Sequence, residues 1–202
     1  MLCLAAGLAL YDAVDATLVA CDQRHAVDLR LKWPNDLLAA PAHDGAAHYQ
    51  KLGGILTELF GCAGSIDFVV IGVGCNVRSA DFPPGVPGTS LRLLLPLDVG
   101  KDRPDVLLPR ALAERFLASL QTWYERYLTG GAAAITTPFS QAARLGPDHG
   151  PVRVRAGRDE APLCGVPVGL GQDGELLLQT ERGIERVLSG DVEMTRLHSA
   201  AV

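Results

Sequence analysis

The sequence predicts an α/β (α+β) fold: a mixed β-sheet covered by helices, followed by a small all-β barrel. A helix-period stretch opens the chain, period-two stretches follow it, and short strand-like pieces separated by glycine turns fill its last quarter. This change of pattern predicts two domains, residues 1–147 and 148–202. The chain has 202 residues, of which 48% are hydrophobic and 20% charged, so it can bury a sizeable core.

The first helix is predicted over residues 2 to about 21, where apolar side chains recur at steps of three or four. The apolar start is faintly similar to a signal peptide, but no basic residue precedes Arg24. Because Asp12 and Asp15 interrupt the run, no membrane-spanning segment is expected. The residues of the buried face are Leu4, Leu8, Tyr11, Val14 and Leu18.

Four strands are predicted after this helix. Apolar and polar residues alternate from Val27 to Trp33, which is typical of a half-buried strand, and Pro34 ends it by removing a backbone donor. The other three are expected at residues 37–40, 51–60 and 67–77. The last of them contains the apolar run FVVIGVG, which predicts a strand covered on both faces.

A long helix is predicted from Pro104 and Asp105 to a stop at Gly130–Gly131, as cover for one face of the sheet. Its apolar stripe consists of Leu108, Leu112, Phe116, Leu120, Trp123 and Tyr127. The strands of the barrel are expected at residues 151–156, 163–170, 175–179, 184–188 and 192–196, with a turn at Asp173–Gly174.

The charge and the cysteines exclude several classes of protein. The net charge of −5 argues against nucleic acid or an anionic membrane as a partner, because such binders carry a basic face. The five cysteines include no CxxC pair, which argues against a disulfide framework and a structural zinc site. A reducing compartment, the cytoplasm, is therefore expected.

The segment KWPND, Lys32 to Asp36, is the first candidate for chemistry. The oxygens of Asn35 and Asp36 suit Mg²⁺, and the Lys32 ammonium suits a phosphate, so this strand end fits a nucleotide. An ordinary turn beside a core tryptophan explains the same residues, and the sequence alone leaves both interpretations open.

The segment Lys51-Leu-Gly-Gly-Ile is the second candidate. Glycine inside a strand is costly and marks the close approach of a ligand or of another backbone. Lys51, just ahead of two glycines, is placed to reach an anion lying across them, although a surface lysine beside a bulge fits equally well. Strict alternation puts Lys51, Gly53 and Ile55 on one face, and Leu52, Gly54 and Leu56 on the other.

The third candidate is Ile71-Gly-Val-Gly-Cys-Asn76, in which alternation puts Gly72, Gly74 and Asn76 on one face. Two positions without side chains followed by an amide form a flat floor for a small planar ligand, with Asn76 near a phosphate or a metal-bound water. The pattern lacks the third glycine of a dinucleotide fingerprint. Cys75 beside it is expected to be a core cysteine, because the sequence indicates no base that would activate it.

Three segments together resemble the catalytic core of the biotin–protein ligase (biotin–[acetyl-CoA-carboxylase] ligase) family. They are LKWPNDLL at 31–38, KLGGILTEL at 51–59 and VVIGVGCNV at 69–77, and Thr89-Ser90-Leu91 matches a further family element. The tail, with Gly165, Asp173–Gly174 and Ser189 to Val192, is similar to the SH3-like C-terminal domain of these ligases.

The resemblance implies a two-step reaction. Biotin and ATP, with Mg²⁺, give biotinyl-5'-adenylate, and a lysine of a biotin carboxyl carrier domain then accepts the biotin. It implies that Lys51 is the catalytic residue, that Lys51, Gly54, Gly72 and Gly74 contact biotin, and that Lys32, Asn35, Asp36 and Asn76 hold nucleotide and Mg²⁺, with Asp36 and Asn76 as metal ligands. A carboxylase carrier domain is the implied partner. The exposed edge of the predicted sheet separately suits a carrier or a second copy of the chain, as a homodimer.

One family element is missing from the sequence. Ligases of this family carry a Ser/Thr-rich strand and a Gly/Arg-rich loop ahead of the region seen here, and the first helix of this chain corresponds to the one that follows that loop. The expectation is a ligase incomplete at its N-terminus and weak or inactive as it stands, through truncation, a split protein or decay. A lipoate ligase-like enzyme and a non-catalytic carrier-binding module are the alternatives.

Overall fold

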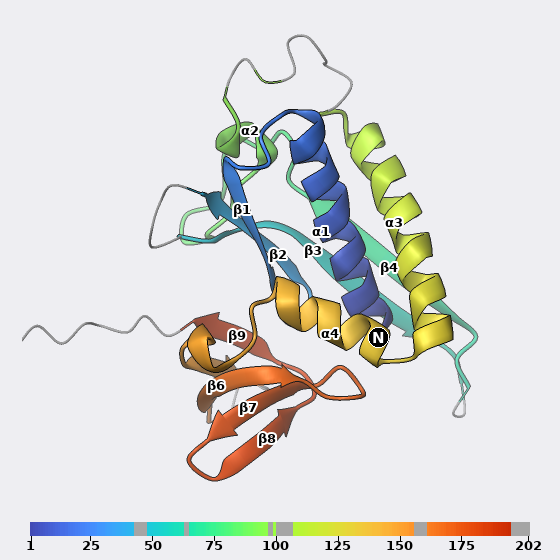
Figure 1. The fold of residues 1–202 in the computed structure, drawn as a ribbon, viewed down its shortest axis with the longest axis vertical. Helices are drawn as coiled ribbons and strands as arrows, with labels where there is room; N and C mark the ends of the chain where they lie inside the picture. Colours follow the sequence, from blue (N-terminus) through green and yellow to red (C-terminus); the bar gives the residue numbers. More distant parts are fainter. Residues whose placement is uncertain (43–47, 63–64, 97–98, 100–106, 156–160, 195–202) are drawn as a thin grey trace, which may run out of the picture.

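The computed structural model describes the chain except for residues 43–47, 63–64, 97–98, 100–106, 156–160 and 195–202. Its named strands form two separate sheets, and the long helices pack on the first of them (Figure 1). The α+β class predicted from the sequence is confirmed at this level. The second sheet begins at Val152, and the domain boundary at residues 147–148 stays a prediction.

The first sheet consists of β1 (Val27–Lys32), β2 (Asp36–Pro41), β3 (Gln50–Phe60) and β4 (Phe68–Cys75), in that order. Each of these strands was predicted within a few residues. All three pairings between neighbours are antiparallel, so the prediction of a mixed sheet is wrong for the described strands. The reason is that each strand is followed directly by its neighbour, and short connections allow only antiparallel pairing.

Helix α1 (Leu2–Ala20) is the central helix, between the first sheet and α3 (Pro109–Gly130) (Figure 1). Its predicted extent is confirmed, and Leu4, Leu8, Val14 and Leu18 of the predicted face are all at most 4% exposed. Tyr11, predicted on the same face, is only partly buried. By length and composition alone α1 qualifies as a membrane span, but 61% of its apolar window is buried inside the protein, as in a core helix.

Helix α3 packs on α1 and covers much of the sheet through it, with Leu112, Phe116 and Trp123 buried. Asp12 of α1 accepts hydrogen bonds from the Trp123 indole at 2.7 Å and the Ser119 hydroxyl at 2.8 Å. These contacts explain why a carboxylate interrupts an otherwise apolar helix, since a partly buried charge is stabilised by hydrogen bonds.

The ends of α3 agree only in part with the prediction. The helix begins at Pro109, and the start predicted at Pro104–Asp105 lies outside the described residues. It ends at Gly130 as predicted, because Gly131 adopts a φ of 67° that favours glycine. The sequence analysis missed α4 (Ala133–Ala142), whose internal Pro138 disfavours a helix, and a 3₁₀ turn follows it at Pro147–His149.

The second sheet has the strand order β8-β7-β6-β5-β9 and only antiparallel pairs. The five predicted strands are present within a residue or two. No pairing joins β8 to β9 in the described part of the chain, so the predicted barrel is corrected to an open sheet, since closure requires the two edge strands to pair. The strands are β5 (Val152–Arg155), β6 (Leu163–Leu170), β7 (Leu176–Thr180), β8 (Gly183–Val187) and β9 (Asp191–Met194).

Specific hydrogen bonds hold the two sheets together. The Trp33 indole, after β1, donates to the Gly174 carbonyl in the β6–β7 turn at 2.9 Å. A further bond ties the segment after α4 to the second sheet, where the Gly146 amide donates to the Pro167 carbonyl of β6 at 2.9 Å. Because Trp33 is only 3% exposed, the turn that carries KWPND is fixed against the second sheet.

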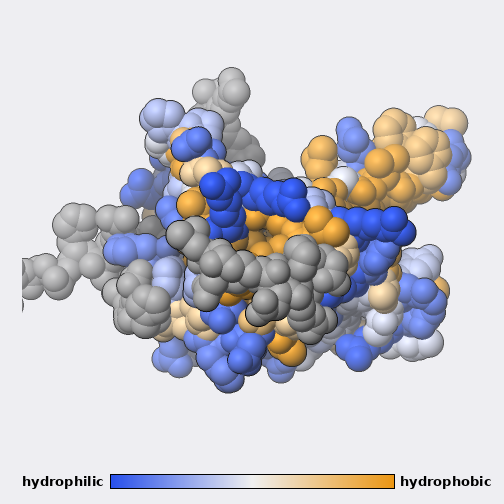
Figure 2. Space-filling view, turned by 90° about the horizontal axis from the view of Figure 1, so that it is seen from above, coloured by the Kyte–Doolittle hydropathy of each residue, from blue (hydrophilic) through white to orange (hydrophobic). Residues whose placement is uncertain are grey.

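The cover predicted for β4 on both faces is wrong for the described structure. Phe68, Val70 and Val73 are 56%, 43% and 39% exposed, and β4 is the edge strand of its sheet. Figure 2 shows apolar side chains gathered on the arm that projects from the molecule at the upper right. An apolar run predicts a tendency of the strand to be buried, but it does not indicate which part of the protein, or which partner, covers it.

Candidate active site

The KWPND segment closes the β1–β2 hairpin and ties it to β3. The Asn35 side-chain amide donates to the Ile55 carbonyl at 2.8 Å, and the Ile55 amide donates to the Asn35 carbonyl at 2.9 Å. These two bonds fix the middle of β3 beside the turn. Asn35 is therefore at least a structural residue, and its predicted contact with nucleotide stays a prediction.

A β-bulge decides which way Lys51 points. β2 pairs with β3 as Leu37↔Gly53 and then Leu38↔Lys51, so the register shifts around Leu52. A bulge breaks strict alternation. The predicted face of Lys51, Gly53 and Ile55 is therefore wrong, because Lys51 lies on the same face as Gly54.

The position of Gly54 follows from this bulge. A Cβ at Gly54 would lie 3.1 Å from Lys51 Cε, 3.2 Å from Lys51 Nζ and 3.3 Å from Asp36 Oδ1. That is tighter than ordinary van der Waals contact. The absent side chain of Gly54 thus makes room for an ion pair, which is a physical reason for glycine here.

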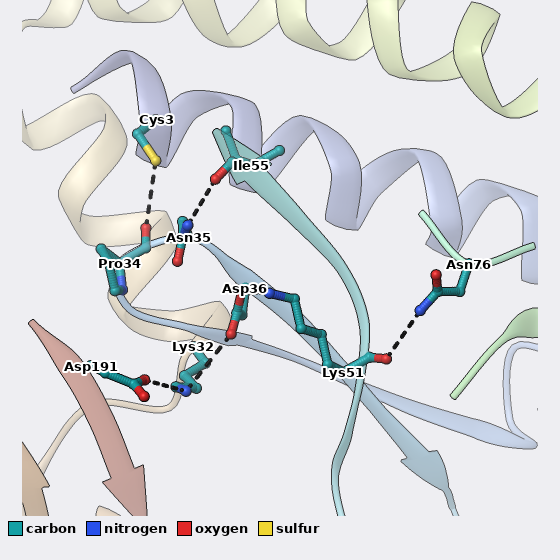
Figure 3. Close-up of polar contacts among 9 residues, drawn as sticks. All are labelled: Cys3, Lys32, Pro34, Asn35, Asp36, Lys51, Ile55, Asn76 and Asp191. Atoms are coloured by element: carbon teal, nitrogen blue, oxygen red, sulfur yellow. Dashed lines mark hydrogen bonds and ion pairs between the residues drawn. The ribbon is translucent and has the colours of Figure 1, made fainter. Parts of the chain in front are cut away.

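Asp36, Lys51 and Lys32 form a line of charges across β1, β2 and β3 (Figure 3). Asp36 Oδ1 lies 2.6 Å from Lys51 Nζ, and its other oxygen lies 3.7 Å from Lys32 Nζ. The Asp36 side chain is 14% exposed, whereas that of Lys51 is 48% exposed. Asp36 therefore binds the Lys51 ammonium on the side that faces the protein. The other side of the Lys51 ammonium faces an open cavity.

The floor of this cavity is built from paired glycines. Gly54 lies opposite Gly74, and Leu56 lies opposite Gly72, so all four share one face of the β3–β4 ladder. A Cβ at Gly74 would meet nothing closer than 3.9 Å. Backbone is thus open to the cavity where the sequence predicted a flat floor.

The cavity has a volume of about 560 Å³, which is in the range of small-molecule sites. It brings together most of the predicted site: Asn35, Lys51, Gly54, Gly72, Gly74 and Asn76 all line it. Lys32 and Asp36 are not among its lining residues, and they reach the site through Lys51. The face predicted for Gly72, Gly74 and Asn76 is confirmed by this lining.

Asn76 fixes the end of β4 to two neighbouring segments. Its side-chain amide donates to the Thr89 carbonyl at 3.1 Å. It also donates to the Lys51 carbonyl at 3.4 Å, a bond drawn in Figure 3. The nitrogen of the amide is thus engaged with backbone. Its oxygen is the atom left to face a ligand.

The loop over residues 79–88 supplies a wall that sequence reasoning missed. Phe82, Val86 and Gly88 line the cavity, and the loop is tied to Lys51, whose amide donates to the Pro87 carbonyl at 2.8 Å. A Cβ at Gly88 would lie 2.3 Å from the Phe82 ring, so this glycine lets the ring pack closely. The signal in the sequence was two aromatic or branched residues within a Pro/Gly-rich loop that follows the glycine strand.

The loop is anchored at its far end by Ser90. The Ser90 hydroxyl donates to the Ser79 carbonyl at 2.6 Å and accepts from the Leu93 amide at 3.3 Å, which caps α2 (Leu91–Leu94). Thr89 and Ser90 are 2% and 0% exposed. The Thr-Ser-Leu element therefore closes the base of the loop.

The described residues do not build a magnesium site around Asp36. Both oxygens of Asp36 face lysine ammoniums, and Asn76 is engaged on the far side of Lys51 (Figure 3). Within the described ranges, no three His, Cys, Asp or Glu side chains come together as a metal site. The metal role of Asp36 and Asn76 stays a prediction.

Cys75 behaves as the core cysteine expected from the sequence. Burial raises the pKa of its thiol to about 12, so the thiolate is scarce at neutral pH. It lies with Val73 and Val77 in an apolar cavity of about 210 Å³ against Leu112 and Phe116 of α3. This is the face of β4 opposite to the glycine floor.

Comparison with known proteins decides the family. No family model matches the chain. The biotin–[acetyl-CoA-carboxylase] ligase of Paracoccus denitrificans is 30% identical over 189 residues, which are 93% of this chain and 70% of that protein. The bifunctional ligase/repressor BirA of Bacillus subtilis is 28% identical over 185 residues, 90% of this chain and 51% of that protein.

The chain belongs to the biotin protein ligase family. Its fold also matches the crystal structure of biotin protein ligase from Aquifex aeolicus, with a TM-score of 0.69 and 21% identity, over 96% of this chain and 74% of that one. The Aquifex ligase has also been solved in complex with biotin and ATP; this match has a TM-score of 0.59 and 25% identity, over 95% of this chain and 69% of that one.

This member of the biotin protein ligase family spans about half the length of the Bacillus relatives, 46% and 51% of the two BirA proteins. A biotin protein ligase-like protein of unknown function from Silicibacter shares the fold as well, with a TM-score of 0.63 and 17% identity, over 92% of this chain and 70% of that one. Family membership therefore shows that this chain and the ligases share a common origin. The activity of this chain depends on the residues of its cavity.

Proposed function

We propose that this chain is a biotin–protein ligase that activates biotin with ATP and transfers it to a lysine of a biotin carboxyl carrier domain. The observation that carries the proposal is the Lys51 ammonium, held by Asp36 at 2.6 Å over a floor of paired glycines. A cation at the edge of a side-chain-free floor suits an anionic, partly planar ligand. Biotin and ATP, which the Aquifex relative binds, supply such groups.

In the first step, a carboxylate oxygen of biotin attacks the α-phosphorus of ATP. The new O–P bond gives biotinyl-adenylate, and pyrophosphate leaves with the electrons of the broken P–O bond. Two anions must approach each other, so a fixed cation stabilises the transition state more than the separated reactants. Lys51 supplies that cation, and Asp36 holds it in place before the substrates arrive.

In the second step, the amine of a carrier lysine attacks the acyl carbon of the mixed anhydride. An amide bond forms, AMP leaves and the amine releases a proton. The open rim of the cavity gives that lysine access, because Gly72, Gly74 and Leu56 are uncovered among the described residues. The carrier domain, a homodimer and a cytoplasmic location are parts of the same proposal.

Exchange of labelled pyrophosphate into ATP tests the first step in the 202-residue chain. The assay is run with biotin, with lipoate and with no acid. We expect slow exchange that requires biotin and is lost in Lys51→Ala, because the fixed cation is removed. The melting temperature should stay near the wild-type value, since the Lys51 side chain is half exposed.

Other results would contradict the proposal. Exchange supported by lipoate and not by biotin would make the chain a lipoate ligase-like enzyme. No exchange with either acid would favour the non-catalytic carrier-binding module. A ligase-like protein of unknown function shares this fold, so the fold alone does not establish ligase activity. Near-wild-type exchange by Lys51→Ala would remove Lys51 from the chemistry.

A further inference from the structure

We propose that Asp191, in the second sheet, is a positioning residue for Lys51, acting through Lys32 and Asp36. This inference rests on the proposed function of the cavity and extends it to the C-terminal sheet. Asp191 Oδ1 lies 3.0 Å from Lys32 Nζ, so the line of charges described above continues into β9 (Figure 3). Four charges of alternating sign thus connect the second sheet to the candidate active site.

The distances along this line indicate that Asp191 draws Lys32 away from Asp36. Lys32 Nζ is 3.0 Å from Asp191 but 3.7 Å from Asp36, whereas Lys51 Nζ is 2.6 Å from Asp36. Lys32 is thereby shared between two carboxylates, and the stronger contact of Asp36 is with Lys51. Without Asp191, Lys32 would turn fully toward Asp36 and compete with Lys51 for its oxygens.

The backbone of Asp191 is fixed in place although its side chain is 74% exposed. It pairs with Arg155 of β5, and the preceding Gly190 packs so close to the Arg155 carbonyl that a Cβ there would lie 2.7 Å away. The next residue, Val192, is 8% exposed and lines the contact between the sheets together with Lys32. Asp191 is therefore aimed at Lys32 by packed neighbours on both sides.

The other end of the line is equally constrained. Lys32 and Asp36 are opposite each other in the register of β1 and β2, so their side chains share one face. Their side chains are 23% and 14% exposed, which weakens solvent screening relative to a fully exposed pair. A change of charge at Asp191 is thus transmitted to Asp36 across two short gaps.

We expect the loss of Asp191 to lower kcat and to leave the KM for ATP nearly unchanged. Replacing Asp191 by a neutral residue makes the cluster one unit more positive, which does not weaken the attraction for ATP. It loosens the hold of Asp36 on Lys51, so the ammonium is no longer fixed where the carboxylate and phosphate meet. A residue needed only for folding would change stability and every kinetic constant together.

Glu193 is a matched control on the same strand. It is also a β9 carboxylate, two residues farther on, but it pairs with Arg155 inside its own sheet at 3.2 Å. Glu193→Gln and Asp191→Asn make the same change of charge at the same strand. Only Asp191→Asn interrupts the line to Lys51.

The test measures biotin-dependent pyrophosphate exchange and the ¹H–¹⁵N signal of the Lys51 ammonium in the unliganded chain. We expect Asp191→Asn to lower kcat about tenfold, or about 1.4 kcal/mol, with little change in the KM for ATP. Asp191→Glu should restore most of the rate, and Glu193→Gln should match the wild type. In the Lys32→Met variant, adding Asp191→Asn should lower kcat no further.

The Lys51 signal separates this inference from the proposed function. If the wild type shows no exchange, the ligase proposal fails, yet Asp191→Asn and Lys32→Met should still shift the Lys51 signal and Glu193→Gln should not. An unchanged Lys51 signal in Asp191→Asn would overturn the inference. So would a loss of rate that is equal in Glu193→Gln, or one that persists in the Lys32→Met background.

Discussion

The two ends of the β3–β4 hairpin differ in how they are held. At the Lys51 end, Asn35 and Asp36 of the KWPND segment and Asn76 after β4 bind β3 from two other segments. At the turn end, Leu59 and Ile66 are each 66% exposed, and the Phe60 ring stacks on the Phe68 ring with centres 4.8 Å apart. One ladder is thus a rigid platform at one end and an exposed apolar arm at the other (Figure 2).

The difference between the two ends explains where the glycines of β3 and β4 lie. Gly54, Gly72 and Gly74 lie at the rigid end, where polar contacts from neighbouring segments hold strands that have no side chains of their own to pack. The arm has large apolar residues instead. Glycine in a strand costs stability, so it is found where the surrounding contacts offset that cost and a ligand needs the space.

The largest effect we predict on this comparison is on stability. Leu52 is 0% exposed and Leu59, on the arm, is 66% exposed, on the same strand. Leu52→Ala should lower the free energy of unfolding by about 2–5 kcal/mol, because it opens a cavity in the core. Leu59→Ala should change it by less than about 1 kcal/mol, because this residue is exposed at a surface position.

Urea unfolding of the two variants measures this difference. Leu59→Ala is the matched control, since it deletes the same atoms from the same strand. Equal losses of stability would show that the arm is packed in solution, and the contrast between the two ends would then be wrong.

A smaller effect should follow from adding one methyl group at the rigid end. In Gly54→Ala the new Cβ would press on Lys51 Nζ and Asp36 Oδ1, at 3.2 and 3.3 Å. We expect biotin-dependent exchange to fall about tenfold with little loss of stability, because the lysine end can move aside. Combined with Asp36→Asn, Gly54→Ala should lower the rate no further, and an additional loss would mean that it acts by another route.

Much of the fold could be predicted from the sequence because its signals are local. Alternation from Val27 to Trp33 and the helix period of α1 gave elements whose bounds the structure confirms. The Gly130–Gly131 stop is also local, since it depends on one residue adopting a positive φ. Helix α4 escaped detection because Pro138 opposes a helix locally and tertiary packing overrides it.

The candidate site could be predicted only as a set of residues. The glycine floor follows from alternation along β4, and the structure confirms its shared face. The face of Lys51 could not be predicted, because the bulge near Leu52 depends on pairing with β2. The contact of Asp191 with Lys32 joins residues 159 positions apart, which no local pattern encodes.

The most direct test of the account is binding of a hydrolysis-resistant biotinyl-adenylate analogue, measured by calorimetry in the wild type and Gly74→Val. A Cβ at Gly74 meets no protein atom closer than 3.9 Å, so the larger side chain fits the empty protein and blocks only the floor. Val73→Thr, on the opposite face of β4, is the control. The account predicts binding in the wild type and the control, and none in Gly74→Val at an unchanged melting temperature. Equal binding by Gly74→Val, or no binding by the wild type, would contradict it.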